Sequence, residues 1–209
     1  MDRLKDIFRE YELLAAEADS AFEKIQKDYG SCVKCDVQCS DCCNSVFGIF
    51  FVESVYISYQ FSRLDRKIRR ELLLRGDKAD KDLLEVEKRL GAYSDPQEQA
   101  LAMSRERVRC PLLDERDKCS LYPVRPVTCR AYGIPTVISG AIHACWKAGF
   151  ERGQSYPYFD LDEAYRKLHL LSCNILDIVG NKDMERASLL VSLSKSIRTP
   201  AERLLSEGY

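Results

Sequence analysis

Apolar side chains recur every three or four residues along much of the first half of the chain, which is the spacing of one face of an α-helix. Glycines follow two of these stretches, at Gly30 and Gly76, where each is predicted to end a helix. Asp95 and Pro96 have the order of a helix start, with a capping side chain before a proline at the first helical position. The pattern therefore predicts helices over residues 3–28, 53–75, 79–90 and 95–108.

The helical pattern returns from residue 160 onward. Asp160 with Glu163, and Thr199 with Glu202, have the spacing of a capping box, in which two side chains cap the first turn of a helix reciprocally. Gly180 is predicted to end the first of these helices. We expect C-terminal helices over residues 160–180, 183–197 and 200–207.

Two stretches depart from the helical spacing. Residues 31–45 have no hydrophobic period, so they are predicted to be irregular chain. The apolar run from Val46 to Val52 fits either a short buried strand or the start of a helix. Five prolines interrupt residues 109–157, which excludes long helices there. Inside that segment, two short apolar triplets flank a Ser-Gly pair and predict a small β-hairpin over residues 136–143.

These elements predict a mainly α fold, namely a single helical domain with two irregular cysteine-rich metal-binding loops and one small β-hairpin. The 209 residues, 45% of them apolar, are enough for one domain with an ordinary core. We expect that domain to span residues 1–209, with an N-terminal helix (1–30), a cysteine-bearing core (31–145) and C-terminal helices (160–207).

Charge and hydropathy argue against two kinds of partner. The net charge is −1, with acidic and basic residues mixed, so no nucleic-acid surface is expected. The longest apolar run spans seven residues, whereas a membrane-spanning helix needs about twenty, so no membrane contact is expected. The N-terminus lacks the basic-then-apolar order of an export signal. We therefore expect a cytoplasmic location, where thiols stay reduced.

The cysteines carry the most specific chemical signal in the chain. There are ten, and in a reducing compartment so many cysteines are typical of metal ligands rather than of disulfides. A disulfide-linked secreted protein is the rival interpretation. An early group and a late group together contain the eight candidate ligands, which are Cys35, Cys39, Cys42, Cys43, Cys110, Cys119, Cys129 and Cys145.

Eight thiolates make two sets of four, and four is the number of ligands of one tetrahedral zinc ion or of one four-iron cluster. Burying them together without cations would be costly, because thiolates repel one another and lose their hydration. We therefore expect the two groups to meet around one or two metal centres. Cys42 and Cys43 are adjacent, so their side chains should diverge and bind different metals, unless one of them bridges two.

The spacing of the cysteines favours an iron–sulfur centre, of the 4Fe-4S type, over zinc. Structural zinc sites usually present CxxC pairs, and the late group has none. Clustered cysteines combined with remote ones fit iron–sulfur ligation at least as well. The chain has two histidines, which argues against a histidine-rich metal site.

In this cysteine pattern the chain resembles the bacterial cysteine-cluster proteins described as a zinc- or iron-chelating domain, often labelled YkgJ-like. The family pattern is CxxxCxxCC, followed by CPxL, then CxIYxxRPxxCR and a last cysteine. One departure is Gln38, which stands where the family often has glycine before the second cysteine, and we expect it to change the local turn. The matching positions are residues 35–43, 110–113, 119–130 and 145.

The resemblance implies a metal or iron–sulfur centre without fixing an activity. A flagellin lysine methylase carries a similar cysteine block with an iron–sulfur cluster, so the resemblance leaves an enzymatic role open. The match spans about residues 35–145 and is specific, because eight cysteines and the Arg-Pro pair fall in order.

Arg125 and Arg130 bracket Cys129 and are the candidate cofactor-binding residues. Guanidinium groups at these positions would offset the negative charge of a four-thiolate centre and can donate hydrogen bonds to sulfur. The alternative is ordinary ion pairing with the acidic residues of the segment 114–117. Of the two cysteines outside the ligand set, Cys32 is interpreted as a thiol beside the site, a ninth ligand or part of a CxxC redox pair. Cys173 is interpreted as a small buried apolar side chain.

Three classes of function are compatible with these residues. The first is a cofactor-bearing protein that acts in redox sensing, electron transfer or metal handling. The second is an iron–sulfur-dependent, protein-modifying enzyme of a methyltransferase-like kind, which predicts an open metal position and a pocket lined by Arg125, Tyr132 or His143. The third is a structural zinc domain for protein interaction. All three leave the protein partner or substrate unidentified.

Overall fold

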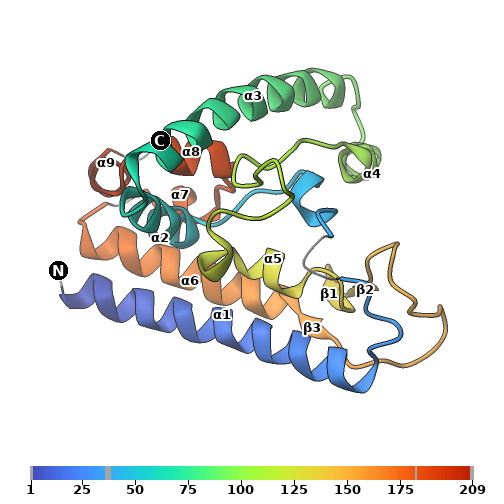
Figure 1. Cartoon of the computed structure of the whole chain (residues 1–209). Coiled ribbons are helices and arrows are strands. Elements are labelled where there is room, and N and C mark those ends of the chain that lie inside the picture. The colour runs from blue at the N-terminus through green and yellow to red at the C-terminus, as the bar shows by residue number, and fades with distance from the viewer. Residues whose placement is uncertain (1, 36–38, 182, 208–209) are drawn as a thin grey trace. The chain divides into compact units, whose positions relative to one another are not determined.

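The computed structural model of the chain describes residues 2–35, 39–181 and 183–207 (Figure 1). The fold is mainly α, as the apolar spacing predicts, with one small sheet. Contacts divide the chain into two compact units, while the single domain expected over residues 1–209 stays a prediction. The first unit comprises Met1–Cys39, Phe50–Glu53 and Arg125–Leu189, and the second comprises Ser40–Ile49, Ser54–Val124 and Leu190–Tyr209.

A long N-terminal helix organises the first unit. This helix, α1 (Asp2–Asp28), buries one stripe of side chains, which confirms the predicted helix. It packs against α5 (Val127–Ala131) and α6 (Leu161–Ile178), and Figure 1 shows both beside it. The buried stripe of α1 consists of Ile7, Tyr11, Leu14, Ala15, Ala18 and Ile25.

The helix α6 begins and ends near the residues that its sequence signals predict. Asp160 accepts a hydrogen bond from the backbone N–H of Glu163 at 2.8 Å, which satisfies one of the donors of the first turn. At the other end Gly180 has a φ of +71°, a conformation that glycine adopts readily just after a helix. The short helix α7 (Glu185–Ser188) packs against α6.

The predicted hairpin is present in the first unit. The strands β1 (Thr136–Ile138) and β2 (Ala141–His143) pair in an antiparallel register around a turn with positive φ at Ser139 and Gly140. A third strand, β3 (Phe159–Asp160), pairs with β1 in parallel and was not predicted, because two residues are too few to show an alternating pattern. The order in the sheet is β2-β1-β3.

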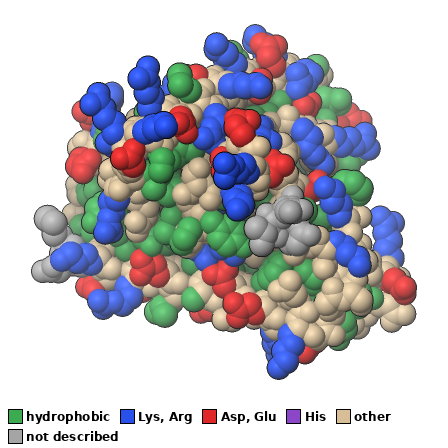
Figure 2. Space-filling view, viewed as in Figure 1, with side chains coloured by type: hydrophobic (Ala, Val, Ile, Leu, Met, Phe, Trp, Pro, Cys, Tyr) green, Lys and Arg blue, Asp and Glu red, His purple; other side chains and the backbone are tan. Residues whose placement is uncertain are grey.

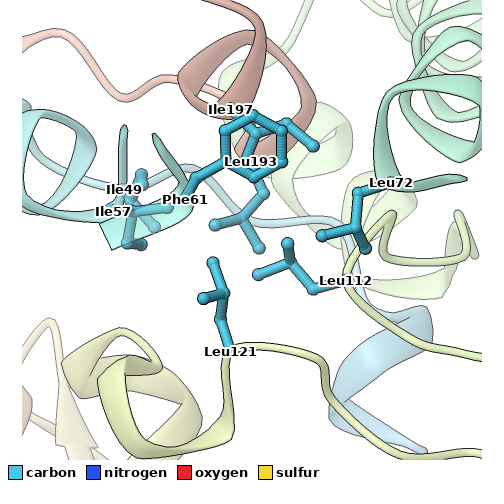
Figure 3. Close-up of a cluster of buried hydrophobic side chains, with 8 residues drawn as sticks. All are labelled: Ile49, Ile57, Phe61, Leu72, Leu112, Leu121, Leu193 and Ile197. Carbon is cyan, nitrogen blue, oxygen red and sulfur yellow. The ribbon is translucent and has the colours of Figure 1, made fainter. Parts of the chain in front are cut away.

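The second unit has an apolar core formed by helices and loops. Its longest helix, α3 (Arg66–Leu90), packs against α8 (Leu193–Arg198) and α4 (Pro96–Arg105). The other elements are η1 (Cys42–Asn44), α2 (Phe51–Ser62) from Ser54 onward, η2 (Tyr122–Val124) and α9 (Ala201–Ser206). Figure 3 shows one core cluster, which consists of Ile49, Ile57, Phe61, Leu72, Leu112, Leu121, Leu193 and Ile197.

The predicted helices over 53–75 and 79–90 are wrong in their boundaries. The chain instead ends α2 at Ser62 and begins α3 at Arg66, where the Asp65 carboxylate accepts a hydrogen bond from the backbone N–H of Lys67 at 2.7 Å. Helical spacing of the apolar residues continues across this break, so periodicity alone did not reveal it. Gly76, taken as a stop, lies inside α3 and is buried.

Replacing Gly76 by alanine is expected to stabilise the protein by about 1 kcal/mol, because alanine loses less backbone entropy in a helix interior. A β-carbon at this position would meet its nearest neighbours, in Ser194 and Arg198, at 3.7 Å, which is ordinary van der Waals contact. Urea unfolding of both proteins measures the difference. A lower free energy of unfolding in the variant would mean that α3 and α8 have no room for a methyl group.

The predicted helix over 183–197 is also wrong. The helix α7 ends at Ser188, and Val191 forms an isolated antiparallel bridge with Ile49 before α8 begins. Ser192 caps α8 by accepting a hydrogen bond from the backbone N–H of Lys195 at 3.2 Å. Within the apolar run over 46–52, Ile49 forms this bridge, and Phe51 and Val52 begin α2.

The last predicted capping box does not form. The Thr199 hydroxyl donates to the Lys195 carbonyl at 3.0 Å, and α9 begins after Pro200 without a side-chain cap. No helix among the described residues is long and apolar enough to cross a bilayer. On the face that Figure 2 shows, Lys and Arg side chains alternate with Asp and Glu. The expectation that no nucleic acid binds stays a prediction.

Candidate metal centres

The eight candidate cysteine ligands divide equally between the two units. The boundary between the units falls after Cys39 in the early group and after Val124 in the late group, so each group is divided in two. All eight side chains are half-buried, and no disulfide involves any of the described cysteines. The first unit therefore holds Cys35, Cys39, Cys129 and Cys145, and the second holds Cys42, Cys43, Cys110 and Cys119.

In the second unit, Cys42 and Cys43 point their thiols toward each other from the short helix η1. The two Sγ atoms lie 3.9 Å apart. Two ligands of one tetrahedral zinc ion, with Zn–S bonds of about 2.3 Å, stand about 3.8 Å apart. The expectation that these adjacent side chains diverge is therefore wrong, because a tight 3₁₀ turn brings the two thiols onto one side.

Backbone hydrogen bonds bring the late cysteines of the second unit to this pair. The N–H of Cys110 donates to the carbonyl of Cys43 at 2.7 Å. The chain then turns, and an antiparallel bridge between Leu113 and Cys119 closes the loop that joins the two late cysteines. Arg75 of α3 donates to the Leu113 carbonyl at 2.6 Å and fixes this loop.

The thiols of the second unit influence one another electrostatically. Burial, with the neighbouring Cys119 and Cys42, raises the pKa of the Cys110 thiol to about 12. A hydrogen bond with Cys43, together with burial, raises the pKa of the Cys42 thiol well above its ordinary range. These thiols keep their protons at neutral pH unless a cation replaces them, so metal binding here would release protons.

In the first unit, the early cysteine segment lies against the end of the helix that carries Cys129. A β-carbon built on Gly133 would lie 2.8 Å from the Cβ of Cys35 and 3.2 Å from its Sγ, so Cys35 packs directly on the Gly133 backbone. Gly133 has a φ of +105° and follows α5 by two residues. Glycine is therefore required there both by the backbone conformation and by the close approach of Cys35.

A second contact joins the early segment to the region of Cys145. The carbonyl of Cys32 accepts a hydrogen bond from the N–H of Gly149 at 2.8 Å. The N–H of Ala148 in turn donates to the carbonyl of Cys145 at 2.9 Å, which forms a turn. Cys32 is half-buried, and its interpretation as a thiol beside the site stays a prediction. Gln38, the departure from the family pattern, lies outside the described residues.

Arg125 and Arg130 both pair with one carboxylate, that of Asp19 in α1. Arg125 Nη2 lies 2.8 Å from Asp19 Oδ1, and Arg130 Nη1 pairs with the other oxygen. Arg130 is 8% exposed and also donates to the Arg125 carbonyl at 2.9 Å. Both guanidinium groups are thus held to α1 by one carboxylate, on either side of Cys129 in the sequence. A direct contact of either arginine with a cofactor stays a prediction.

The donor sets fit zinc or iron by their chemistry, because four thiolates are the ligands that these metals take in cysteine-rich sites. Within the part of the chain that the structure describes, no three side chains of His, Cys, Asp or Glu already stand where they could hold one ion. A change of χ1 rotamer moves a cysteine Sγ by about 3 Å. Rotation of the neighbouring cysteines is therefore the movement by which a bound ion would complete each set.

Cys173 lies apart from the backbone contacts that join the two cysteine groups. On α6 its Sγ lies 3.8 Å from a ring nitrogen of His169, one helical turn away. It is half-buried rather than fully buried, so the expectation of a buried apolar side chain is wrong in degree. The other histidine, His143, is exposed on β2.

A pocket of about 680 Å³ lies in the first unit, between α6 and the hairpin turn. None of the three residues predicted for an enzyme's pocket, Arg125, Tyr132 and His143, lines it. Its wall approaches α5, because the Tyr165 hydroxyl lies 3.3 Å from the Thr128 hydroxyl. The lining includes Phe50, Ser139, Asp162, Tyr165, Arg166 and His169.

Two acidic residues that contact the chain around Cys129 were missed in the sequence. Asp19 gave no signal, because it is one of several acids on a charged helix. Glu53 gave one, because it is a single acid in the apolar run from Phe51 to Ile57. Its carboxylate accepts a hydrogen bond from the N–H of Val127 at 3.0 Å, at the start of α5.

A comparison with known protein families gave a match to the segment that contains these cysteines. The model of one family, CxxCxxCC, described as a "putative zinc- or iron-chelating domain", matches residues 32–145. The matched segment begins at Cys32 and ends at Cys145, so it contains all eight candidate ligands. No curated protein and no solved structure matched the chain.

Proposed function

Because the chain belongs to the CxxCxxCC family of zinc- or iron-chelating domains, we propose that it is a metal-binding protein with two separate centres. Each centre is held by four cysteine thiolates, and each compact unit contains one of them. The first uses Cys35, Cys39, Cys129 and Cys145, and the second uses Cys42, Cys43, Cys110 and Cys119.

The observation that carries this proposal is the equal division of the cysteines, because four ligands in each unit is the number that one centre needs. The separation of 3.9 Å between Cys42 Sγ and Cys43 Sγ supports one zinc or iron ion bound by both thiolates. Each cysteine of a 4Fe-4S cluster binds its own iron, so its ligands stand farther apart. For the second unit we therefore favour a single ion over the 4Fe-4S cluster that the cysteine spacing favours.

Four thiolates around a tetrahedral ion leave no open coordination position. Such a centre suits metal handling or, with iron, electron transfer, and it does not suit hydrolytic catalysis. The proposal places the protein in the cytoplasm, where the thiols stay reduced and available to metal. The positive charge of Arg125 and Arg130 would offset part of the charge of the first centre.

The test is metal analysis of protein purified without oxygen, together with its absorption spectrum and a determination of acid-labile sulfide. The wild-type protein is expected to hold two centres. The variants Cys43→Ala and Cys129→Ala are each expected to keep one, and the double variant none. Iron without sulfide indicates single-iron centres, equal iron and sulfide indicates a cluster, and a colourless protein with zinc indicates zinc centres.

The matched control is Cys173→Ala, which removes a half-buried cysteine outside both sets and should leave the metal content unchanged. Complete metal loss in either single variant would contradict the proposal, because it would mean one centre that draws on both units. Unchanged metal content in Cys43→Ala and Cys129→Ala would contradict the assignment of ligands.

A further inference from the structure

The carboxyl group of Glu53 is among the most deeply buried charged groups in the described chain, with 1% of the residue exposed. Burying a carboxylate is costly unless hydrogen bonds compensate it. Both of its oxygens are used within the first unit. One accepts a hydrogen bond from the N–H of Phe50 at 3.1 Å, and the other accepts from the N–H of Val127 at 3.0 Å.

The two donors belong to the starts of two different helices. Phe50 precedes α2, and Glu53 is the third residue of that helix, so this bond is the usual cap of a helix by its own glutamate. Val127 is the first residue of α5, which has no side-chain cap of its own because Pro126 occupies the capping position. Glu53 therefore supplies from α2 the cap that α5 lacks.

The helix that Glu53 caps is short and carries a proposed metal ligand. With five residues, α5 cannot be stable by itself, because isolated helices of that length do not form in water. Cys129 is its third residue, and Arg130, which follows, is fixed by Asp19. The direction of the Cys129 side chain therefore depends on two contacts. One is the hydrogen bond from the N–H of Val127 to Glu53, before Cys129, and the other is the ion pair of Arg130 with Asp19, after it.

From these contacts we infer that Glu53 is a positioning residue for the first metal centre, holding α5 so that Cys129 faces its fellow ligands. This inference rests on the proposed function. Residues that orient metal ligands typically change metal affinity by about 10–100-fold when they are replaced. The effect of Glu53 should be confined to the first centre, because both of its hydrogen-bond partners belong to the first unit.

The experiment uses Co²⁺ as a spectroscopic probe in two backgrounds that each keep one centre. Cys43→Ala leaves the first centre, and Cys129→Ala leaves the second. In the first background, Glu53→Gln is expected to weaken Co²⁺ binding about 10-fold and Glu53→Ala about 100-fold. In the second background, neither change should alter binding. Glutamine keeps the size of the side chain and one acceptor, so it guards against a simple failure to fold.

Ser172→Ala is the matched control. The Ser172 hydroxyl is fully buried and accepts a hydrogen bond from the N–H of Val52, in the first turn of α2, but no hydrogen bond joins it to α5. This change should therefore loosen α2 without affecting Co²⁺ at the first centre. Equal weakening by Glu53→Gln in both backgrounds, or none in the first, would overturn the inference.

A second measurement needs no metal. Amide hydrogen exchange of α5 in the metal-free protein should accelerate about 10-fold in Glu53→Gln, as the loss of one buried hydrogen bond predicts. Unchanged exchange would overturn the inference. If neither background binds Co²⁺, the proposed function fails, and the exchange rate alone then decides whether Glu53 holds α5.

Discussion

Gly133→Ala is expected to abolish metal binding at the first centre and to lower the free energy of unfolding by about 3 kcal/mol. Two costs combine. Alanine is strained at the φ of +105° that Gly133 adopts, and its β-carbon would lie 2.8 Å from the Cβ of Cys35. That Cβ is fixed to the backbone, so relief requires moving the Cys35 segment away from α5.

Gly153→Ala separates the two costs. Gly153 also has a positive φ, +85°, but a β-carbon there would meet nothing within 4 Å. This variant should show the backbone strain alone and keep both metal centres. Urea unfolding and metal analysis of both variants make the comparison. If Gly133→Ala retained a full first centre, Cys35 would not need its present position to bind metal.

The second large effect is a pH dependence of stability that arises from Glu53. Burial, opposed by the hydrogen bonds from Val127 and Phe50 and by the charge of Arg130, raises the pKa of its carboxyl from 4.5 to about 7. Between pH 4.5 and about pH 7, the Glu53 carboxyl group therefore holds a proton in the folded protein that it has lost in the unfolded chain. This contribution to stability is complete below pH 4.5 and is lost as the pH rises to about 7, a change of about 3 kcal/mol.

Glu53→Gln should remove this dependence, because the amide does not titrate. The free energy of unfolding of the wild type, relative to the variant, should therefore fall between pH 5 and pH 7 when both are measured by urea unfolding. Glu85→Gln is the control. Glu85 is exposed, and its hydrogen bond with Lys88 lowers its pKa, so it is already charged throughout this range. A constant difference between wild type and Glu53→Gln would show that Glu53 ionises like an exposed carboxyl group.

Local signals predicted those elements whose cause is local. The stripe on α1, the Asp160 cap of α6 and the turn at Ser139 and Gly140 each depend on residues close together in sequence, and each was confirmed. The break before α3 was missed because the apolar spacing runs through it. The bridge of Val191 with Ile49 was missed because its two halves are far apart along the chain.

The cysteine pattern by itself predicted that this chain belongs among zinc- or iron-chelating domains, and the match of the family model to residues 32–145 confirmed it. Which of the two compact units each of the eight cysteines belongs to was decided only by the tertiary structure. The chain passes from one unit to the other between Cys39 and Ser40, and again between Val124 and Arg125. Those crossings depend on packing between distant segments, and spacing along a sequence does not record which segments pack together. For the same reason the partners of Asp19 and Glu53 emerged only from the fold, since each acts on residues more than seventy positions away.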